Sequence, residues 1–307
     1  MKILVTGVTG QLGFDVVRTL IKEGHEAVGT GRKGVFESLV QDNIVANIPY
    51  ISMDITNETD VIKIIKEINP EAIIHCAAWT AVDDAEDNEE AAFKVNELGT
   101  KNLANAAKMV EAKFVYISTD YVFDGKGITP YQPDNSNCNP TSVYGASKLA
   151  GEEAVKNILE KYFIVRISWV FGINGANFVK TMLQVGKNHD KVTVVNDQIG
   201  SPTYTYDLSH LLIDMIKTEN YGTYHARNEG DFISWYDFTR EIYKQANLST
   251  EIVPVTTEEY GISKAARPLN SRLDTSKLNL NNFNTLPMWQ DALKRYLKEL
   301  KLTEGDL

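Results

Sequence analysis

Short apolar runs rich in β-branched residues alternate along this chain with stretches whose apolar residues recur at helical spacing. The first run, 2–6, is followed by glycines and then by apolar positions from Leu12 to Ile21 that share one helical face until Gly24. Further runs typical of buried strands lie at 49–53, 72–76, 113–118, 163–168 and 192–196. This alternation predicts an α/β fold with a doubly wound parallel sheet and helices on both of its faces.

The alternation breaks after Trp169, where the pattern predicts a second, smaller domain. A loop and helix are expected over 172–191, an amphipathic helix opened by Ser234 over 235–246, and a polar, irregular stretch over 270–284. Such a domain would lie over the carboxyl ends of the strands, where open α/β sheets bind ligands. We therefore predict a sheet domain at 1–168 and 190–228, and a discontinuous α+β domain at 169–189 and 229–307.

The turn between the first strand and the first helix is Thr6-Gly7-Val8-Thr9-Gly10-Gln11-Leu12-Gly13. Gly7 permits a tight turn, Gly10 lets backbone N–H groups approach an anion, and Gly13 lets the helix pack closely on the strand. The positive end of the helix would then face the phosphates of a dinucleotide. We therefore predict a Rossmann-type NAD(P)-binding domain, with an ordinary glycine-rich turn as the alternative.

The residue that selects the cofactor ribose is expected about twenty positions past the glycines, at the end of the second strand. No carboxylate stands there, and Arg32 and Lys33 follow the strand instead. A guanidinium can bind a 2′-phosphate through two parallel hydrogen bonds, whereas a carboxylate would accept one from a free 2′-hydroxyl. We therefore expect NADPH. The alternative is NADH, with the two basic side chains merely solvated.

The composition excludes several classes of protein. The 307-residue chain has a net charge of −10, which argues against a nucleic-acid partner, because Lys and Arg contacts with phosphate dominate such binding. Cys76 and Cys138 are the two cysteines and lack CxxC or His-Cys spacing, so neither a disulfide framework nor a metal site is predicted. No apolar run of 18 residues and no signal peptide occur, so we expect a cytoplasmic protein without membrane attachment.

Tyr144 and Lys148 form a YxxxK pair in a strongly helix-forming segment that extends to Val155. The spacing of four places both side chains on one helical face. A nearby ammonium favours the phenolate, so we expect the pKa of Tyr144 to fall toward neutrality. Tyr144 could then donate a proton to an alkoxide as a hydride arrives. The alternative is a surface Tyr-Lys pair without chemistry.

Two further observations bear on this pair. The strand 114–117 delivers Ser118 and Thr119 to the carboxyl edge of the sheet, where a hydroxyl could hydrogen-bond a substrate carbonyl. Tyr260 and Lys264 match the same spacing, but the adjoining loop composition gives no helix to align them, so we interpret that match as coincidence. The glycine turn, the hydroxyl and the Tyr-Lys pair together indicate an NAD(P)-dependent oxidoreductase.

Seven motifs are distributed over nearly the whole chain: TGxxGxxG from Thr6, AAWTAVDDAE from Ala77, STDYVF from Ser118, YxxxK from Tyr144, RISWVF from Arg166, GSPT from Gly200 and RPxNSxL from Arg267. With them the chain resembles the extended short-chain dehydrogenase/reductase superfamily and, within it, the dTDP-4-dehydrorhamnose reductases. The first and fourth motifs identify only the superfamily. The AVDDAE, STDYVF and RPxNSxL segments are more particular to the reductases.

The resemblance implies reduction of a dTDP-linked 4-keto-6-deoxy sugar to dTDP-L-rhamnose, with the smaller domain binding the nucleotide sugar. It implies that Thr119 polarises the ketone, Tyr144 protonates the new hydroxyl, and Lys148 holds the nicotinamide ribose. The residues expected to bind the cofactor are Gly7, Gly10, Gln11, Leu12, Gly13, Arg32, Asp54, Ile55, Ala77, Ala78, Trp79, Ile117, Ser118, Tyr144 and Lys148. The residues expected to bind the substrate are Thr119, Asp120, Tyr121, Trp169 and, at the diphosphate, Arg267.

Other interpretations stay open for some of these residues. Asp54 could cap the helix that begins near Asn57, and Trp169 could simply belong to the core. Some relatives form metal-bridged dimers through acidic residues, and Asp15 lies where one such acid occurs; we interpret Asp15 as a solvated helix residue and leave a homodimer open.

Three other functions also stay open. One is a different nucleotide-sugar 4-ketoreductase, and a second is a nucleotide-sugar epimerase, which shares the scaffold and the Tyr-Lys pair. The third is a non-catalytic regulatory subunit like the methionine adenosyltransferase beta subunit. The STDYVF and RPxNSxL segments favour the reductase, and the retention of Thr119, Tyr144 and Lys148 favours an enzyme.

Overall fold

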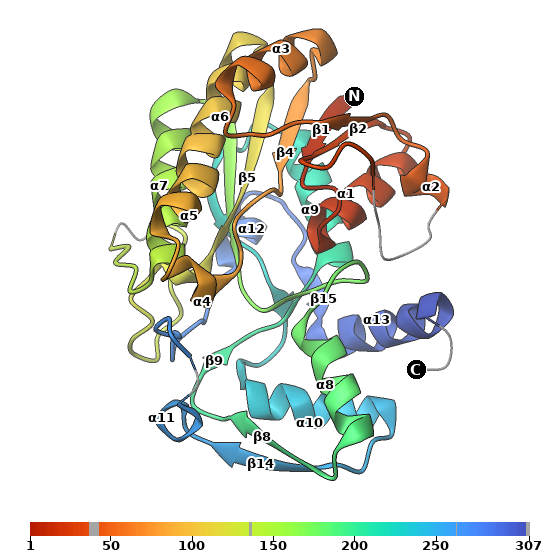
Figure 1. Ribbon diagram of the computed structural model, residues 1–307, viewed down its shortest axis with the longest axis vertical. Coiled ribbons are helices and arrows are strands. Elements are labelled where there is room, and N and C mark those ends of the chain that lie inside the picture. Colours follow the sequence, from red (N-terminus) through yellow and green to blue (C-terminus); the bar gives the residue numbers. More distant parts are fainter. Residues whose placement is uncertain (37–42, 135–136, 262, 305–307) are drawn as a thin grey trace.

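A seven-stranded parallel sheet forms the centre of the computed structural model, which describes residues 1–36, 43–134, 137–261 and 263–304. The strand order is β11-β6-β5-β4-β1-β2-β3, and each strand runs parallel to its neighbours (Figure 1). This confirms the predicted α/β fold with a Rossmann-type sheet. The strands are β1 (Lys2–Thr6), β2 (Glu26–Gly31), β3 (Tyr50–Ser52), β4 (Ala72–His75), β5 (Lys113–Thr119), β6 (Tyr162–Ile167) and β11 (Gly222–His225).

Helices cover both faces of this sheet, which explains why its strands are continuous apolar runs. In β1, Ile3 and Val5 join one buried cluster, whereas Leu4 between them joins the cluster on the other face. The first cluster contains residues of α1 (Gln11–Lys22), α2 (Asn43–Ala46) and α9 (Thr205–Ile216). The second contains residues of α3 (Glu58–Ile68), α6 (Thr100–Met109) and α7 (Val143–Ile158).

The second part of the chain consists of helices and two-stranded sheets that lie beside the carboxyl edge of the main sheet (Figure 1). Its helices are α8 (Phe178–Asn188), α10 (Trp235–Ala246), α11 (Thr257–Tyr260) and α13 (Trp289–Glu304). The short helix α12 (Ser276–Leu280) packs instead against β11 of the main sheet. Its strand pairs are β7 (Val170–Phe171) with β10 (Thr203–Tyr204), β8 (Lys191–Val195) with β14 (Glu251–Val255), β9 (Ile199–Gly200) with β13 (Ile233–Ser234), and β12 (Asn228–Glu229) with β15 (Leu286–Met288). Among the described helices, none has both the length and the apolar character needed to cross a membrane.

Several elements of this part differ in detail from the sequence-based predictions. Helix α10 begins after Ser234 as predicted, and Ser234 and Asp237 form a capping box. The strand expected at 192–196 exists as β8, but it pairs with β14 and not with the main sheet, whose outermost strand is β11. A β-branched run predicts a strand without specifying its partner, which explains the difference. The domain boundaries themselves remain a prediction.

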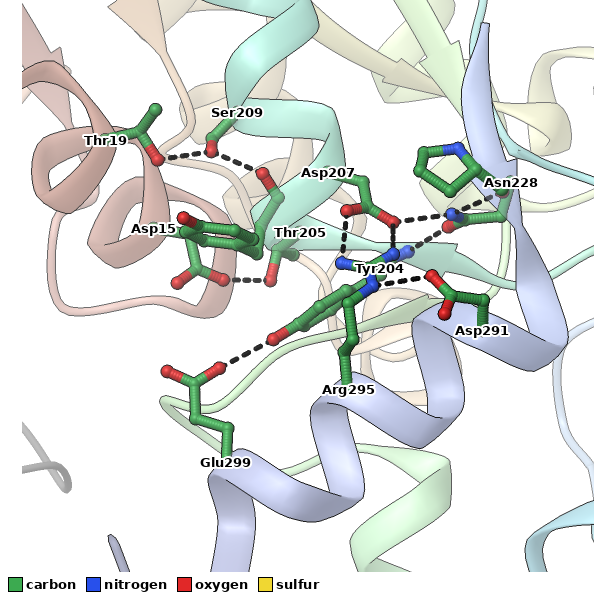
Figure 2. A network of polar contacts seen from close by, with 12 residues as sticks. Asp15, Thr19, Tyr204, Thr205, Asp207, Ser209, Asn228, Asp291, Arg295 and Glu299 are labelled. Atoms are coloured by element: carbon green, nitrogen blue, oxygen red, sulfur yellow. Dashed lines mark hydrogen bonds and ion pairs between the residues drawn. The ribbon is translucent and has the colours of Figure 1, made fainter. Parts of the chain in front are cut away.

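Asp15 of the first helix is fully buried, so its interpretation as a solvated residue is wrong. The Thr205 hydroxyl of α9 donates a hydrogen bond to one carboxylate oxygen (Figure 2). The Arg18 guanidinium lies 3.0 Å from the other oxygen. Burial raises the pKa of Asp15 to about 7, although Arg18 and Thr205 act in the opposite direction. The face of α1 that carries Asp15 is covered by chain nearly 200 residues away.

Helix α13 completes this buried polar network (Figure 2). The Arg18 guanidinium donates to the Glu299 carboxylate, which also accepts a hydrogen bond of 2.6 Å from the Tyr204 hydroxyl. One turn earlier on α13, Arg295 binds Asp207 of α9 through two hydrogen bonds of 2.7 Å. The network therefore joins the first helix of the chain to the last one, and both to α9.

Replacing Arg18 with Met should destabilise the protein strongly, because the buried Asp15 carboxyl and the Glu299 carboxylate would lose their shared cation. Removal of one partner from a buried ion pair typically costs about 3–5 kcal/mol of unfolding free energy, which urea denaturation measures. Arg240→Met is the matched control, since the Arg240 side chain is 63% exposed and lies 4.0 Å from Asp237. We expect the control to lose less than about 1 kcal/mol. Equal losses in the two variants would contradict the proposed role of the network.

The Asp15 carboxyl should also make stability depend on pH. Its pKa is about 7 in the folded protein and about 4 in an unfolded chain. Between these two pH values the folded protein binds a proton at Asp15 that the unfolded chain has already released. The folded state therefore has its full stability below about pH 4, and this contribution is lost as the pH rises through about 7. We expect the wild type to lose stability relative to Asp15→Asn between about pH 4 and pH 7 in urea denaturation, with little further change above that range. A difference in unfolding free energy between the two proteins that stays constant over this range would show that the pKa of Asp15 is not raised in the folded state.

Candidate active site

The carboxyl ends of β1, β2, β4, β5 and β6 line a cleft of about 620 Å³. Parallel strands bring their carboxyl ends to one edge of a sheet, which is where open α/β sheets bind ligands. Arg267 is the one residue of the predicted site that does not line this cleft. The predicted residues that do line it are Gly7, Gly10, Gln11, Leu12, Gly13, Arg32, Asp54, Ile55, Ala77, Ala78, Trp79, Ile117, Ser118, Thr119, Asp120, Tyr121, Tyr144, Lys148 and Trp169.

The glycine turn has the geometry of an anion cradle. Gly7 has a φ of +69°, and a Cβ there would lie 2.8 Å from the backbone of Ala77, so only glycine fits. A Cβ on Gly13 would overlap the carbonyl group of Gly7. Gly10 is the N-cap of α1 and has no side chain to cap the helix, so the first N–H groups stay available to an anion. A dinucleotide pyrophosphate therefore fits this turn.

A loop from the second part of the chain supports the glycine turn, and no sequence motif predicts this. The Asn174 side chain donates to the carbonyl of Thr9 over 3.0 Å, and the Asn177 side chain donates to Gln11 over the same distance. Between them, Gly175 and Ala176 line the cleft. Because these contacts span more than 160 residues of sequence, no local pattern could have identified them.

Arg32 and Asp54 line the cleft just after β2 and β3. The Arg32 side chain is exposed at the end of β2. The Asp54 carboxylate accepts hydrogen bonds of 2.9 Å from the backbone and hydroxyl of Thr56, and its pKa is lowered by these bonds and by the charge of Arg32. Asn57, and not Asp54, is the N-cap of α3. The capping alternative for Asp54 is therefore wrong.

Tyr144 stands in the first turn of α7, beside Thr119 at the end of β5. Ser142 caps α7 by accepting a hydrogen bond of 3.1 Å from the N–H of Gly145. The Thr119 hydroxyl lies close enough to the Tyr144 phenol to influence its pKa, and the ring of Tyr144 packs edge-on against Tyr121 with 5.5 Å between centroids. This arrangement brings two hydroxyl groups together in the cleft.

The expected lowering of the Tyr144 pKa is wrong. Burial raises the pKa of Tyr144 above its ordinary value, and the Thr119 hydroxyl opposes the rise only in part. Lys148 is 3% exposed, and its ammonium lies 4.0 Å from the centre of the Tyr116 ring. Burial lowers the pKa of Lys148 to about 7, while the charge of Glu152 acts to raise it. The phenol is therefore protonated at neutral pH.

Ser118 and Thr119 occupy different environments. The Ser118 hydroxyl donates to Glu152 over 2.6 Å, and Arg166 also binds that buried carboxylate with bonds of 2.8 and 2.6 Å. The Thr119 hydroxyl donates over 3.0 Å to Asp120, a buried carboxylate whose pKa burial raises to about 6. Of the two predicted hydroxyls, Thr119 is therefore the one placed beside Tyr144.

Trp169 and Arg267 lie on the side of the cleft formed by the second part of the chain. Trp169 lines the cleft and stacks on Trp235, so it is not simply a core residue. The Arg267 guanidinium donates to Asp83 over 2.5 Å and to the Tyr121 hydroxyl over 3.1 Å. Since Tyr121 lines the cleft, Arg267 stands directly behind its wall.

Asn96 is a further residue that the sequence analysis missed. It lies in a π-helical turn, Lys94–Gly99, which follows α5 (Glu89–Phe93) and precedes α6. Its amide accepts from the N–H of Trp79 over 2.8 Å and donates to the Trp79 carbonyl and to Ser147. Asn96 therefore fixes the loop after β4 against α7. An Asn and a Gly within an otherwise helical stretch are the signal that could have indicated it.

Known proteins match both the sequence and the fold. The family model described as RmlD substrate binding domain matches residues 1–302. A dTDP-4-dehydrorhamnose reductase of Aggregatibacter actinomycetemcomitans is 39% identical, covering 95% of this chain and 97% of the relative. The spore coat polysaccharide biosynthesis protein SpsK of Bacillus subtilis (strain 168) is 37% identical, covering 97% of each chain.

A solved structure of the same kind agrees with the present one. The crystal structure of dTDP-4-dehydrorhamnose reductase from Bacillus anthracis str. Ames, in complex with NADP, superimposes with a TM-score of 0.88 at 42% identity. The match covers 97% of this chain and 100% of that one. By its sequence, its fold and its cleft, this chain belongs to the RmlD substrate-binding-domain family, which includes the dTDP-4-dehydrorhamnose reductases.

Proposed function

We propose that this protein is a dTDP-4-dehydrorhamnose reductase. It transfers a hydride from NADPH to the C4 ketone of dTDP-4-dehydro-6-deoxy-L-mannose and gives dTDP-L-rhamnose. The observation that carries this proposal is that the glycine turn and the Thr119–Tyr144 hydroxyl pair line one cleft. The names of the relatives support the choice of a dTDP-linked sugar.

The bound cofactor supplies the hydride from its dihydronicotinamide ring. As C4 accepts it, Tyr144 donates its phenolic proton to the ketone oxygen, so that one hydride and one proton convert the carbonyl to an alcohol. The raised pKa of Tyr144 suits this direction, because the phenol holds its proton at neutral pH. Thr119 turns its hydroxyl from Asp120 to the ketone oxygen and stabilises the developing charge.

The remaining residues bind and orient the two ligands. The N-terminus of α1 and the glycine turn hold the pyrophosphate, Arg32 holds the 2′-phosphate, and Lys148 holds the nicotinamide ribose. Trp169, Asp120 and Tyr121 surround the sugar, and Arg267 acts at the dTDP diphosphate. In this scheme 169–189 and 229–307 are the nucleotide-sugar domain. A homodimer and a cytoplasmic location remain predictions.

The experiment that tests the proposed function is NADPH oxidation over a panel of dTDP-, UDP- and GDP-linked 4-keto-6-deoxy sugars. We expect turnover confined to the dTDP series. In the same assay, Tyr144→Phe should lower kcat by at least about 100-fold while NADPH binding is unchanged, because the proton donor is lost and the cradle is intact. Tyr260→Phe, in the second YxxxK match, is the control and should keep wild-type activity. An active Tyr144→Phe variant would refute the assignment of the acid.

Arg32→Ala should reduce the preference for NADPH over NADH. Loss of a charge-assisted, bidentate hydrogen bond to the 2′-phosphate should lower kcat/KM with NADPH by about 10- to 100-fold. The value of kcat/KM with NADH should hardly change. Lys33→Ala, at the next exposed position, is the matched control and should have the smaller effect. An NADH preference in the wild type that persists unchanged in Arg32→Ala would exclude this role for Arg32.

A further inference from the structure

Trp169 has a strained backbone at the point where the chain leaves the main sheet. It follows β6 and precedes β7, and its φ is +51°. The other non-glycine residues with positive φ in the described chain are three asparagines and Glu111, so Trp169 is the one aromatic residue among them. Such a conformation is an outlier for a bulky side chain, and it persists only where the surroundings enforce it.

The surroundings of the Trp169 indole come from the second part of the chain. Its ring stacks on that of Trp235 with 3.7 Å between centroids and 13° between planes, and Trp235 packs in turn on Phe178 at 4.4 Å. The backbone of Gly200 also lies close to this ring, since a Cβ there would be 2.9 Å from it. The indole is therefore held by contact with a second indole and with a glycine backbone, while it still lines the cleft.

Trp235 itself does not line the cleft. It is the first residue of α10, directly after β13, and β13 pairs with β9, which contains Gly200. The capping box of Ser234 and Asp237 fixes the start of α10, and with it the backbone of Trp235. The rigid start of one helix thus sets the position of a ring that lines the cleft.

We propose that Trp235 is a positioning residue for the sugar: it holds Trp169 in its strained conformation, so that the Trp169 ring forms a fixed wall at the sugar end of the cleft. An aromatic ring binds the apolar face of a pyranose, and a ring already held in place binds it without losing rotamer freedom. Without Trp235, Trp169 relaxes and sugar binding weakens. The nicotinamide side of the cleft, with Thr119 and Tyr144, is unaffected. This inference rests on the proposed function.

The stacked pair has a spectroscopic signature. Two indoles in contact couple their electronic transitions, which gives a pair of opposite bands in the far-ultraviolet circular dichroism spectrum. The chain contains four tryptophans, and Trp289→Phe serves as the matched control because it removes an indole outside the pair. We expect the band pair in the wild type and in Trp289→Phe, and its loss in Trp235→Phe and Trp235→Leu.

Steady-state kinetics with the dTDP-linked ketosugar then separate positioning from general damage. Trp235→Leu, which stays apolar but is smaller and has no ring, should raise the KM for the sugar about tenfold. Its kcat should change less than about threefold, and its Kd for NADPH should match the wild type. Trp235→Phe retains a stacking surface and should restore the KM to within about threefold of the wild type.

Three results would overturn the inference. The first is a wild-type spectrum without the band pair, and the second is an unchanged sugar KM in Trp235→Leu. The third is a Kd for NADPH that rises in Trp235→Leu together with the KM for the sugar, which would indicate a purely structural role. These failures differ from failure of the proposed function, since in that case the wild type itself would reduce none of the dTDP-linked ketosugars.

Discussion

Parallel pairing of the main sheet is the constraint on which the site depends. Because β1, β4, β5 and β6 run in the same direction, their carboxyl ends meet at one edge, and each end contributes a different part of the cleft. The glycine turn follows β1, Trp79 follows β4, Thr119 ends β5 and Trp169 follows β6. Hydrogen-bond register, and not proximity in sequence, brings these groups together.

Buried polar contacts then fix the positions of the helices on the sheet, which strand pairing alone does not determine. Helix α1 is held at its buried face by the Asp15–Arg18–Glu299 network, and α7 is held by Asn96 and by Glu152. Apart from the Asp15–Arg18 pair within α1, each of these contacts joins separate segments of the chain and so restricts how the cradle and the hydroxyl pair lie relative to one another. The relative positions of the cradle and of the hydroxyl pair are therefore built into the fold.

The sequence predicted what depends on local pattern. Strand and helix periodicity gave the parallel sheet, and the glycine spacing gave the cradle. Burial of a polar side chain depends on what packs over it, which explains why the interpretation of Asp15 as solvated is wrong: its cover comes from α9, whose Thr205 hydroxyl binds it. The pKa of Tyr144 was misjudged for the same reason, because a YxxxK spacing specifies neighbours on a helix but not the loss of water around the phenol. Asn96 acts through backbone contacts that leave little trace in composition.

In the proposed reaction the Thr119 and Tyr144 hydroxyls together face the reacting ketone. A crystal structure with NADP⁺ and dTDP-L-rhamnose bound would reveal this arrangement. We expect the C4 oxygen of the sugar to lie within hydrogen-bond distance of both hydroxyl oxygens, with C4 against the nicotinamide ring. A sugar bound in the cleft with its C4 oxygen out of reach of Tyr144 would contradict this proposal.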